Sequence, residues 1–339
     1  MNVGFIGTGW IAERMAKTIL EMADEGIFLT AVGSRSLEKA KEFVGNAFMR
    51  SDETRFTDGT HKCVPYGSYE ELAADDSLDL IYIATPHSHH FEHAKLCMEN
   101  GRNVLVEKSF TVNAKQAREL VEISREKKLL LAEAIWTRYM PSRFALEKIL
   151  ASKIIGEPTM LTANLGYNNI HMERMFAPEL AGGALLDLGV YPINFALMAF
   201  GNDIERIESS ADLFHTGIDL HNNITIHFKD GKYAELYASL DESTDRKGII
   251  KGSQGWLEFE NINNCEWIRA HIDNTSENRK VHFDVPEQIT GLEYQVRSCK
   301  KAIEDKKIEC PEMPHEEIIR VMEIMDSLRK EWKIKYPFE

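Results

Sequence analysis

The first third of the chain alternates short apolar runs with stretches of helical period. The apolar runs predict strands at Val3–Ile6, Phe28–Gly33, His61–Val64, Leu78–Ala84, Asn103–Val106 and Leu129–Glu133. Apolar positions three and four residues apart predict helices at Ile11–Met22, Leu37–Phe43, Tyr69–Ala73, His89–Asn100 and Ala114–Lys127. The polar stretch Gly45–Thr60 is predicted to be a surface excursion. Apolar strands separated by helices indicate a parallel sheet covered on both faces.

After Pro141 the pattern changes to period-two alternation. Ile224, Ile226 and Phe228 share one face of a predicted strand, and Asp230-Gly231 predicts a hairpin turn into Tyr233–Leu240. Other predicted strands are Thr159–Gly166, Gly248–Lys251, Gly255–Glu260, Glu266–Ile272 and Val281–Val285. Predicted helices are Ser142–Leu150, Gly183–Phe200, Leu292–Glu304 and Glu316–Trp332. This half is predicted to be an α+β domain with an open, largely antiparallel sheet and helices on one face.

The first predicted strand runs directly into the turn Gly7–Ala12, which reads G-x-G-x-x-A. Gly7 allows a tight reversal, Gly9 lets the backbone approach a pyrophosphate, and Ala12 lets the new helix pack closely on the strand. The helix N-terminus then directs free N–H groups at the phosphates. The motif is weak alone, but it stands here in the required strand–turn–helix context.

The chain has 339 residues, and this length predicts two domains. We expect an NAD(P)-binding Rossmann domain (1–125, doubly wound α/β) and a second domain (126–339).

The end of the second predicted strand indicates which nucleotide binds. In NAD-binding versions of this fold an acidic residue there binds the ribose 2′-hydroxyl, but this strand ends in Gly33-Ser34-Arg35. Ser34 offers a hydroxyl, Arg35 a guanidinium suited to phosphate, and Lys39 a second charge one helical turn on. We therefore expect NADP(H) to be preferred, with NAD(H) possible. The alternative is that Ser34 caps the helix and Arg35 is a solvated surface residue.

Composition limits the partners. A formal net charge of −14 without a basic patch argues against nucleic acid or an anionic membrane as a main partner. No apolar run is judged long enough to span a bilayer, and we expect no secretory leader before the first strand. The five cysteines are scattered and never form C-x-x-C, so we expect reduced thiols in a cytoplasmic protein.

Two further motifs follow predicted strands. Four histidines lie within residues 87–93, and the pair His89 and His93 has the spacing of a helical zinc site. No second ligand cluster accompanies them, so we predict no metal and expect Pro86 and the following loop to pass beside the nicotinamide half of a dinucleotide.

The fifth predicted strand ends in Glu107-Lys108. Ligands of parallel sheets bind at such strand ends, so this pair is a candidate for chemistry. The alternative is an exposed ion pair.

Together these motifs resemble the glucose–fructose oxidoreductase/inositol dehydrogenase (Gfo/Idh/MocA) family. The glycine turn, the Ala-Thr-Pro-x-x-x-His run from Ala84 to His90, the Glu-Lys pair and the segment Gly182–Tyr191 occur there in the same order. The resemblance covers essentially the whole chain. The motifs are most similar to those of dimeric dihydrodiol dehydrogenases and NADP-dependent xylose dehydrogenases. One departure is Ser109, since most members have proline there, and this change is expected to loosen the loop of Lys108.

The resemblance implies an NADP-dependent dehydrogenase or reductase acting on a carbinol of a sugar, polyol or dihydrodiol. It implies Tyr191 as acid/base, Lys108 as its electrostatic partner and Asp187 as an orienting group. Which of Tyr191 and Lys108 moves the proton stays open, and Pro192 is expected to kink the helix and aim the phenol. The expected substrate contacts are Asp187, Tyr191, Trp136 and Arg138. For Trp136 and Arg138, the alternative is packing at the domain interface. Expected cofactor contacts are Gly7, Thr8, Gly9, Trp10, Ile11, Ser34, Arg35, Lys39, Ala84, Thr85, Pro86, His87, His90, Glu107 and Lys108.

Two expectations concern the whole protein. An open sheet with helices on one face leaves its other face in need of cover, so a homodimer or homotetramer through the C-terminal sheet is expected. The alternative to an enzyme is a catalytically inactive dinucleotide-binding regulatory protein that has kept the fold.

Overall fold

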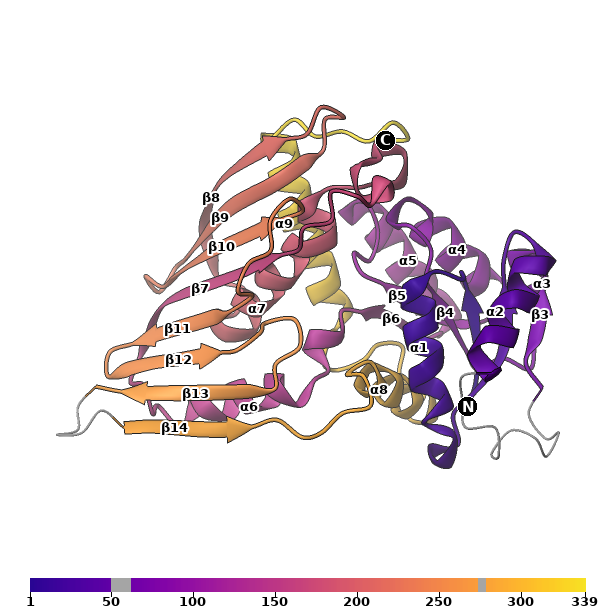
Figure 1. Ribbon diagram of the computed structural model, residues 1–339, viewed down its shortest axis with the longest axis horizontal. Helices are drawn as coiled ribbons and strands as arrows, with labels where there is room; N and C mark the ends of the chain where they lie inside the picture. The colour runs from indigo at the N-terminus through magenta and orange to yellow at the C-terminus, as the bar shows by residue number, and fades with distance from the viewer. Residues whose placement is uncertain (50–61, 274–278) are drawn as a thin grey trace. The chain divides into compact units, whose positions relative to one another are not determined.

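The computed structural model describes residues 1–49, 62–273 and 279–339, and its chain forms two compact units (Figure 1). The first unit comprises Met1–Trp136 and Gln288–Met322, and the second comprises Thr137–Glu287 and Glu323–Glu339. The chain thus returns to the first unit after completing the second sheet. The sequence places its domain boundary at 125/126 and does not anticipate this return.

The first unit contains a six-stranded parallel sheet. Its strands in spatial order are β3 (Val64–Tyr66), β2 (Phe28–Gly33), β1 (Asn2–Ile6), β4 (Leu80–Ile83), β5 (Asn103–Glu107) and β6 (Leu131–Ala134). Every residue of β4 and β6 is buried, as expected for strands covered on both faces. The strand order reverses beside β1, and ligands of such sheets bind at this switch point.

The connections of this sheet are helical. They are α1 (Trp10–Leu20), α2 (Leu37–Met49), α3 (Tyr69–Ala73), α4 (His87–Glu99) and α5 (Ala114–Lys127), followed later in the unit by α8 (Glu293–Glu304) and the first part of α9 (His315–Glu331). Ser68 and Asn113 cap α3 and α5 by accepting backbone N–H groups at 3.2 and 3.0 Å. The helix α2 continues beyond Phe43 into the predicted surface excursion, whose residues 50–60 lie outside the described chain, as do residues 61 and 274–278.

The second unit contains an eight-stranded mixed sheet. In spatial order the strands are β14 (Arg279–Asp284), β13 (Trp267–Ile272), β12 (Gly255–Phe259), β11 (Gly248–Gly252), β7 (Pro158–Gly166), β10 (Tyr233–Ser239), β9 (Asp219–Phe228) and β8 (Ile204–Leu213). The β7–β10 pair is parallel and the other pairs are antiparallel. Helices α6 (Pro141–Ala151) and α7 (Val190–Phe200) belong to this unit, and α7 packs on β7 and β10. The predicted fold class is confirmed.

One strand is missing from the sequence prediction. β8 reads IERIESSADL, and every one of its side chains is at least partly exposed. It lies at the edge of the sheet, where one flank has no partner strand among the described residues. An edge strand with polar residues on both faces lacks the apolar alternation on which the prediction depends.

One helical stretch of the described chain, Pro178–Phe200, has the length and apolar composition to cross a membrane, contrary to the sequence reading. Of its most apolar window, 83% is buried inside the protein. This is the pattern of a core helix.

Candidate active site

The glycine turn joins β1 to α1 in the first unit. Gly7 has φ +108°, and a Cβ there would lie 2.5 Å from the carbonyl oxygen of Ala84, so only glycine fits. A Cβ at Gly9 would meet no described atom within 4 Å, which leaves room above the backbone at the start of α1. The first turn of α1 has no side-chain cap. An open approach and uncapped N–H groups fit a dinucleotide pyrophosphate.

Backbone hydrogen bonds hold the strand ends together at this edge. Gly7 N–H donates to the Gly33 carbonyl at 3.2 Å, and Ala84 N–H donates to the Ile6 carbonyl at 2.8 Å. The carboxyl ends of β1, β2 and β4 are therefore neighbours, and β5 pairs with β4. The structure thus brings most of the predicted cofactor residues to one edge of the sheet. They are Gly7, Thr8, Gly9, Trp10, Ile11, Ser34, Arg35, Ala84, Thr85, Pro86, His87, His90, Glu107 and Lys108.

The loop after β2 carries the residues predicted to select the nucleotide. Ser34 is buried and its N–H donates to the Tyr66 carbonyl at 3.2 Å. Ser36 rather than Ser34 caps α2, because its hydroxyl accepts the N–H of Lys39 at 3.4 Å. The capping alternative for Ser34 is therefore wrong. Arg35 and Lys39 are exposed, as a binding surface for a phosphate requires.

His90 ties the loop after β4 to the loop after β5. Its Nδ1 lies 2.9 Å from the carbonyl oxygen of Ser109, and its Nε2 lies 2.8 Å from that of Thr85. Burial lowers the pKa of His90 to about 3, against the raising effect of the two carbonyl oxygens, so the ring is neutral at physiological pH and its single N–H donates to one of them. Ser109 is itself fully buried. The loop that carries Lys108 is held at Ser109, and the expected loosening is not what the contacts show.

The histidines engage protein partners. His87 meets His90 edge-on with ring centroids 5.6 Å apart, and His89 stacks on His93 at 5.7 Å. Within residues 1–49, 62–273 and 279–339 no group of three or more His, Cys, Asp or Glu side chains is arranged to hold a metal ion.

Glu107 anchors the backbone of Lys108. Its Oε1 accepts the hydroxyl of Tyr82, and its Oε2 accepts the Lys108 N–H at 3.2 Å. Glu107 is buried and Lys108 is half-buried, so this strand end is not exposed as the alternative reading required. The carboxylate fixes the main chain from which the Lys108 side chain leaves the strand end.

In the second unit Asp187 lies in a π-helical turn, Leu185–Gly189, which continues into α7. The Asp187 N–H donates to the Gly183 carbonyl at 3.2 Å, and Tyr191 follows in the first turn of α7. Both side chains are buried to 7% exposure. Pro192 closely follows the π turn within this continuous helical stretch and has no N–H to donate to the preceding turn, so the π turn lies next to the position where the sequence predicts a kink. π turns are frequent at functional sites.

Asp219 supports this turn from the start of β9. Its Oδ2 accepts the Leu185 N–H at 2.6 Å and the Asn222 Nδ2–H at 2.8 Å. Burial raises the pKa of Asp219 to about 6, against the lowering effect of these hydrogen bonds. Gly183 has φ +124°, and a Cβ there would lie 2.4 Å from Asp219 Oδ1. The glycine therefore admits the carboxylate to the base of the turn.

The two expected aromatic and cationic substrate residues have different surroundings. Arg138 is buried in the second unit, and its Nε donates to Asn194 Oδ1 at 2.7 Å, while Asn194 Nδ2 donates to the Val190 carbonyl at 2.8 Å. Trp136 is buried in the first unit, where the Arg14 guanidinium lies 4.8 Å from its ring centroid. Arg138 thus supports the start of α7, and the substrate roles of both residues stay predictions.

Comparison with known proteins decides the family. A model described as "Oxidoreductase family, NAD-binding Rossmann fold" matches residues 1–134, and one described as "GFO/IDH/MocA C-terminal domain" matches residues 145–258. D-xylose 1-dehydrogenase (NADP(+)) from Hypocrea jecorina is 31% identical over 98% of this chain and 92% of its own. The chain belongs to the Gfo/Idh/MocA family.

Other members show the same extent of similarity. Human trans-1,2-dihydrobenzene-1,2-diol dehydrogenase is 29% identical over 98% of this chain and 97% of its own. The structure of a 3-ketoreductase from Actinomadura kijaniata in complex with NADP and TDP-benzene has a TM-score of 0.83 at 25% identity, with 97% of each chain covered. The matches span both units, so the family expected from the sequence is confirmed.

Several supporting residues in this Gfo/Idh/MocA chain escaped sequence reasoning. Asp219 accepts a backbone N–H 34 positions away, Asn194 accepts from the Arg138 side chain 56 positions away, and neither stands in a recognisable motif. The Tyr336 hydroxyl donates to the Gly182 carbonyl at 2.8 Å, across 154 positions. Only the glycine pair before the turn hints at a close approach.

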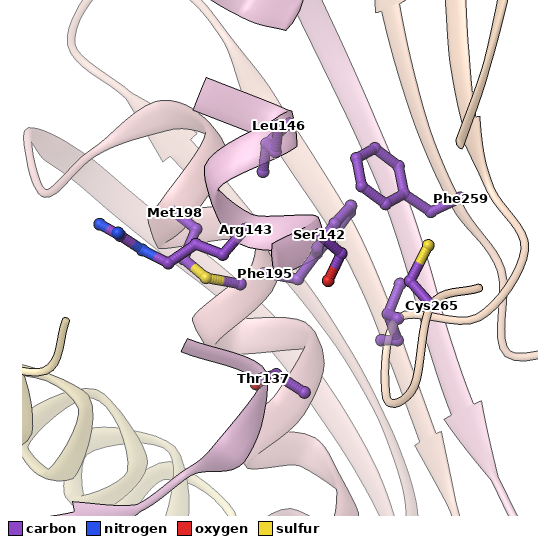
Figure 2. A pocket seen from close by; sticks show the side chains of 9 residues that line it. Thr137, Ser142, Arg143, Leu146, Phe195, Met198, Phe259 and Cys265 are labelled. Atoms are coloured by element: carbon purple, nitrogen blue, oxygen red, sulfur yellow. The ribbon is translucent and has the colours of Figure 1, made fainter. Parts of the chain in front are cut away.

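A small cavity in the second unit is not a substrate site of this family member. Its volume is about 20 Å³, and its lining includes side chains of α6, α7 and β12 (Figure 2). A pocket for an organic ligand is larger by more than tenfold, typically about 300–1,000 Å³. The space corresponds to about one water molecule, so we assign it to packing. The lining residues are Thr137, Ser142, Arg143, Leu146, Phe195, Met198, Phe259, Ile262 and Cys265.

Proposed function

We propose that this protein is an NADP-dependent oxidoreductase that transfers hydride between NADP(H) and the carbinol or carbonyl of a sugar, polyol or dihydrodiol. The substrate class is supported by relatives named for D-xylose and trans-1,2-dihydrobenzene-1,2-diol, each matched over 98% of this chain. The observation that carries the proposal is the cofactor edge, where the Gly7–Ile11 turn meets the loop of Ser34 and Arg35.

The proposed NADP preference follows from the loop after β2. Exposed Arg35 can bind a 2′-phosphate, and no acidic residue stands at this strand end to repel it. Lys39 adds a charge in the first turn of α2. The relative from Hypocrea jecorina is named for NADP(+) and supports the same preference.

The proposed chemistry assigns one role to each of three residues of the chain. When bound, the nicotinamide ring supplies or accepts the hydride. Tyr191 exchanges the hydroxyl proton, and Lys108 supplies positive charge to the developing alkoxide. Asp187 orients the substrate. Free tyrosine and lysine both titrate near ~10, which is too high for efficient proton exchange at neutral pH unless their surroundings shift the pKa.

A cofactor titration is the first experiment. Trp10 lies within the glycine turn and is 56% exposed, so its fluorescence should report occupancy of the site. We expect clearly tighter binding of NADPH than of NADH. Tighter NADH binding would overturn the phosphate argument alone. Failure to bind either would overturn the whole proposal.

Turnover separates the enzyme from an inactive cofactor-binding regulator. D-xylose, other aldoses and trans-dihydrodiols should be screened with NADP while NADPH absorbance is followed. We expect turnover with at least one of them. Tight NADPH binding without turnover on any sugar, polyol or dihydrodiol would favour the regulatory alternative.

We also propose assembly into a homodimer or homotetramer through the face of the eight-stranded sheet opposite α7. That face presents partly exposed Ile249 and Tyr237, and Trp256 stacked on His271 with centroids 4.4 Å apart. Such side chains are enriched at the centres of protein interfaces. Light scattering should show an oligomer that Trp256→Glu dissociates, and a monomeric wild type would refute the assembly.

A further inference from the structure

A row of aromatic side chains continues from the proposed nucleotide loop onto α4. Tyr69, at the start of α3, lies near the Arg35 guanidinium, whose charge acts to lower the pKa of the Tyr69 hydroxyl against the larger raising effect of burial. Its ring meets that of His93 edge-on at 4.5 Å, and His93 stacks on His89 at 5.7 Å. The four residues follow the carboxyl ends of β2, β3 and β4 in the first unit. Of these four residues, only Arg35 has been given a role in cofactor binding so far.

Local hydrogen bonds hold the two imidazole rings. His89 Nδ1 lies 2.8 Å from the Ser88 hydroxyl, and His93 Nδ1 lies 3.0 Å from the Thr85 hydroxyl. His89 is half-buried, so its ring can be reached from solvent. The ring is thus oriented by its Nδ1, and Nε2 is the nitrogen left to bind a ligand.

The charges around this row distinguish the two histidines. The groups that face them are Arg35 from the loop after β2 and Tyr69 and Glu70 from α3. Burial and then the charge of Arg35 lower the pKa of His89, so the ring is mostly neutral at pH 7. Burial and the neighbouring His89 lower the pKa of His93 to about 4, so that ring stays neutral.

We propose that His89 joins Arg35 in recognising the 2′-phosphate of NADP(H), and that it takes up a proton when the phosphate binds. This inference rests on the proposed NADP preference. A phosphate dianion beside Arg35 offsets the positive charge that disfavours imidazolium and supplies an acceptor for its N–H. Tyr69 and His93 hold the two recognising groups in place. Selectivity for NADPH over NADH therefore rises as the pH falls toward 6.

Binding measurements across pH test this without turnover. Dissociation constants of NADPH, NADH, 2′-AMP and 5′-AMP are measured for wild type and His89→Gln between about pH 8 and 6. His282→Gln on β14 of the second unit is the matched control. Comparing variants at one pH cancels the titration of the phosphate itself. We expect the NADPH:NADH selectivity of wild type to rise about fivefold relative to His89→Gln over this range.

Calorimetry in two buffers of different ionisation enthalpy gives an independent readout. Wild type should take up more protons with NADPH than His89→Gln does, and the excess should be absent with NADH. Tyr69→Phe, which removes the hydroxyl near Arg35, should weaken NADPH binding equally at every pH.

The outcomes separate this inference from the proposed function. Identical pH profiles for wild type and His89→Gln, with NADPH still preferred, would overturn the role of His89 alone. Equal weakening of NADPH and NADH in His89→Gln would also overturn it, because the residue would then only pack. Absence of any NADPH preference in wild type would remove the cofactor proposal and this inference with it.

Discussion

The Asp219 carboxylate accepts the backbone N–H of Leu185 at 2.6 Å, at the start of the turn that carries Asp187. The same oxygen accepts Asn222 Nδ2–H at 2.8 Å, and Asp219 is 1% exposed. Water cannot replace these contacts. The carboxylate therefore fixes the beginning of the π turn, and through it the approach to Tyr191, without needing to touch a substrate.

Asp219→Ala should therefore lower both stability and turnover. The substitution leaves two buried donors without their acceptor, which costs about 2–4 kcal/mol in the free energy of unfolding. We expect kcat to fall while the affinity for NADPH, measured by fluorescence, stays unchanged, because the cofactor edge belongs to the other unit.

Asp219→Asn is the conservative comparison, since it retains one acceptor oxygen. It should recover part of the kcat lost in Asp219→Ala. Wild-type kcat in the alanine variant would show that the turn does not depend on this carboxylate.

Tyr191→Phe and Lys108→Met test the proposed acid/base pair. Each removes a group that exchanges or stabilises charge in the transition state, so we expect kcat to fall by about 10²–10⁴-fold. NADPH affinity should survive Tyr191→Phe. Steady-state kinetics and fluorescence titration on the same preparation measure both. Turnover at the wild-type rate in Tyr191→Phe would refute its assignment as acid/base.

The sequence predicts the first unit well because its signals are local. The strand Phe28–Gly33 and the helices Tyr69–Ala73 and Ala114–Lys127 have the predicted bounds. Apolar runs, capping residues such as Asn113 and the glycine turn all act within a few positions of one another. The cofactor edge follows, because strand ends of a parallel sheet carry the motif residues.

The supports of the second unit are not predictable in this way. Asp219 reaches Leu185 across 34 positions and Arg138 reaches Asn194 across 56, so no local pattern links these partners. The edge strand β8 is not predicted for a different reason. Both of its faces are partly exposed, so its sequence does not alternate between apolar and polar residues. The cap of α2 is Ser36 and not Ser34. Because the two serines are only two positions apart, the sequence alone does not distinguish them.

His90 should make the protein sensitive to acid. In the folded state its pKa is lowered to about 3, while in the unfolded chain it titrates near ~6.5. The unfolded state therefore binds the extra proton between these values. Stability is fully present above about pH 6.5 and is lost as the pH falls toward 3.

His90→Gln measures this contribution. The difference in unfolding free energy between wild type and His90→Gln should shrink by roughly 2–3 kcal/mol between about pH 6.5 and 4.5. Denaturant titrations at several pH values provide the comparison. A difference independent of pH would mean that the ring is not held neutral.

Gly7 and Gly9 should respond in opposite ways to alanine. Gly7→Ala imposes a side chain at φ +108° and a contact of 2.5 Å with the Ala84 carbonyl oxygen, so we expect loss of folding stability. A Cβ at Gly9 meets no described atom within 4 Å, and its φ of −82° suits any residue, so Gly9→Ala should melt like wild type. The added methyl group lies where a pyrophosphate would approach, and we expect NADPH affinity to fall by about 10–100-fold. Thermal unfolding and fluorescence titration separate the two effects. Wild-type affinity in a stable Gly9→Ala variant would mean that this turn does not hold the dinucleotide.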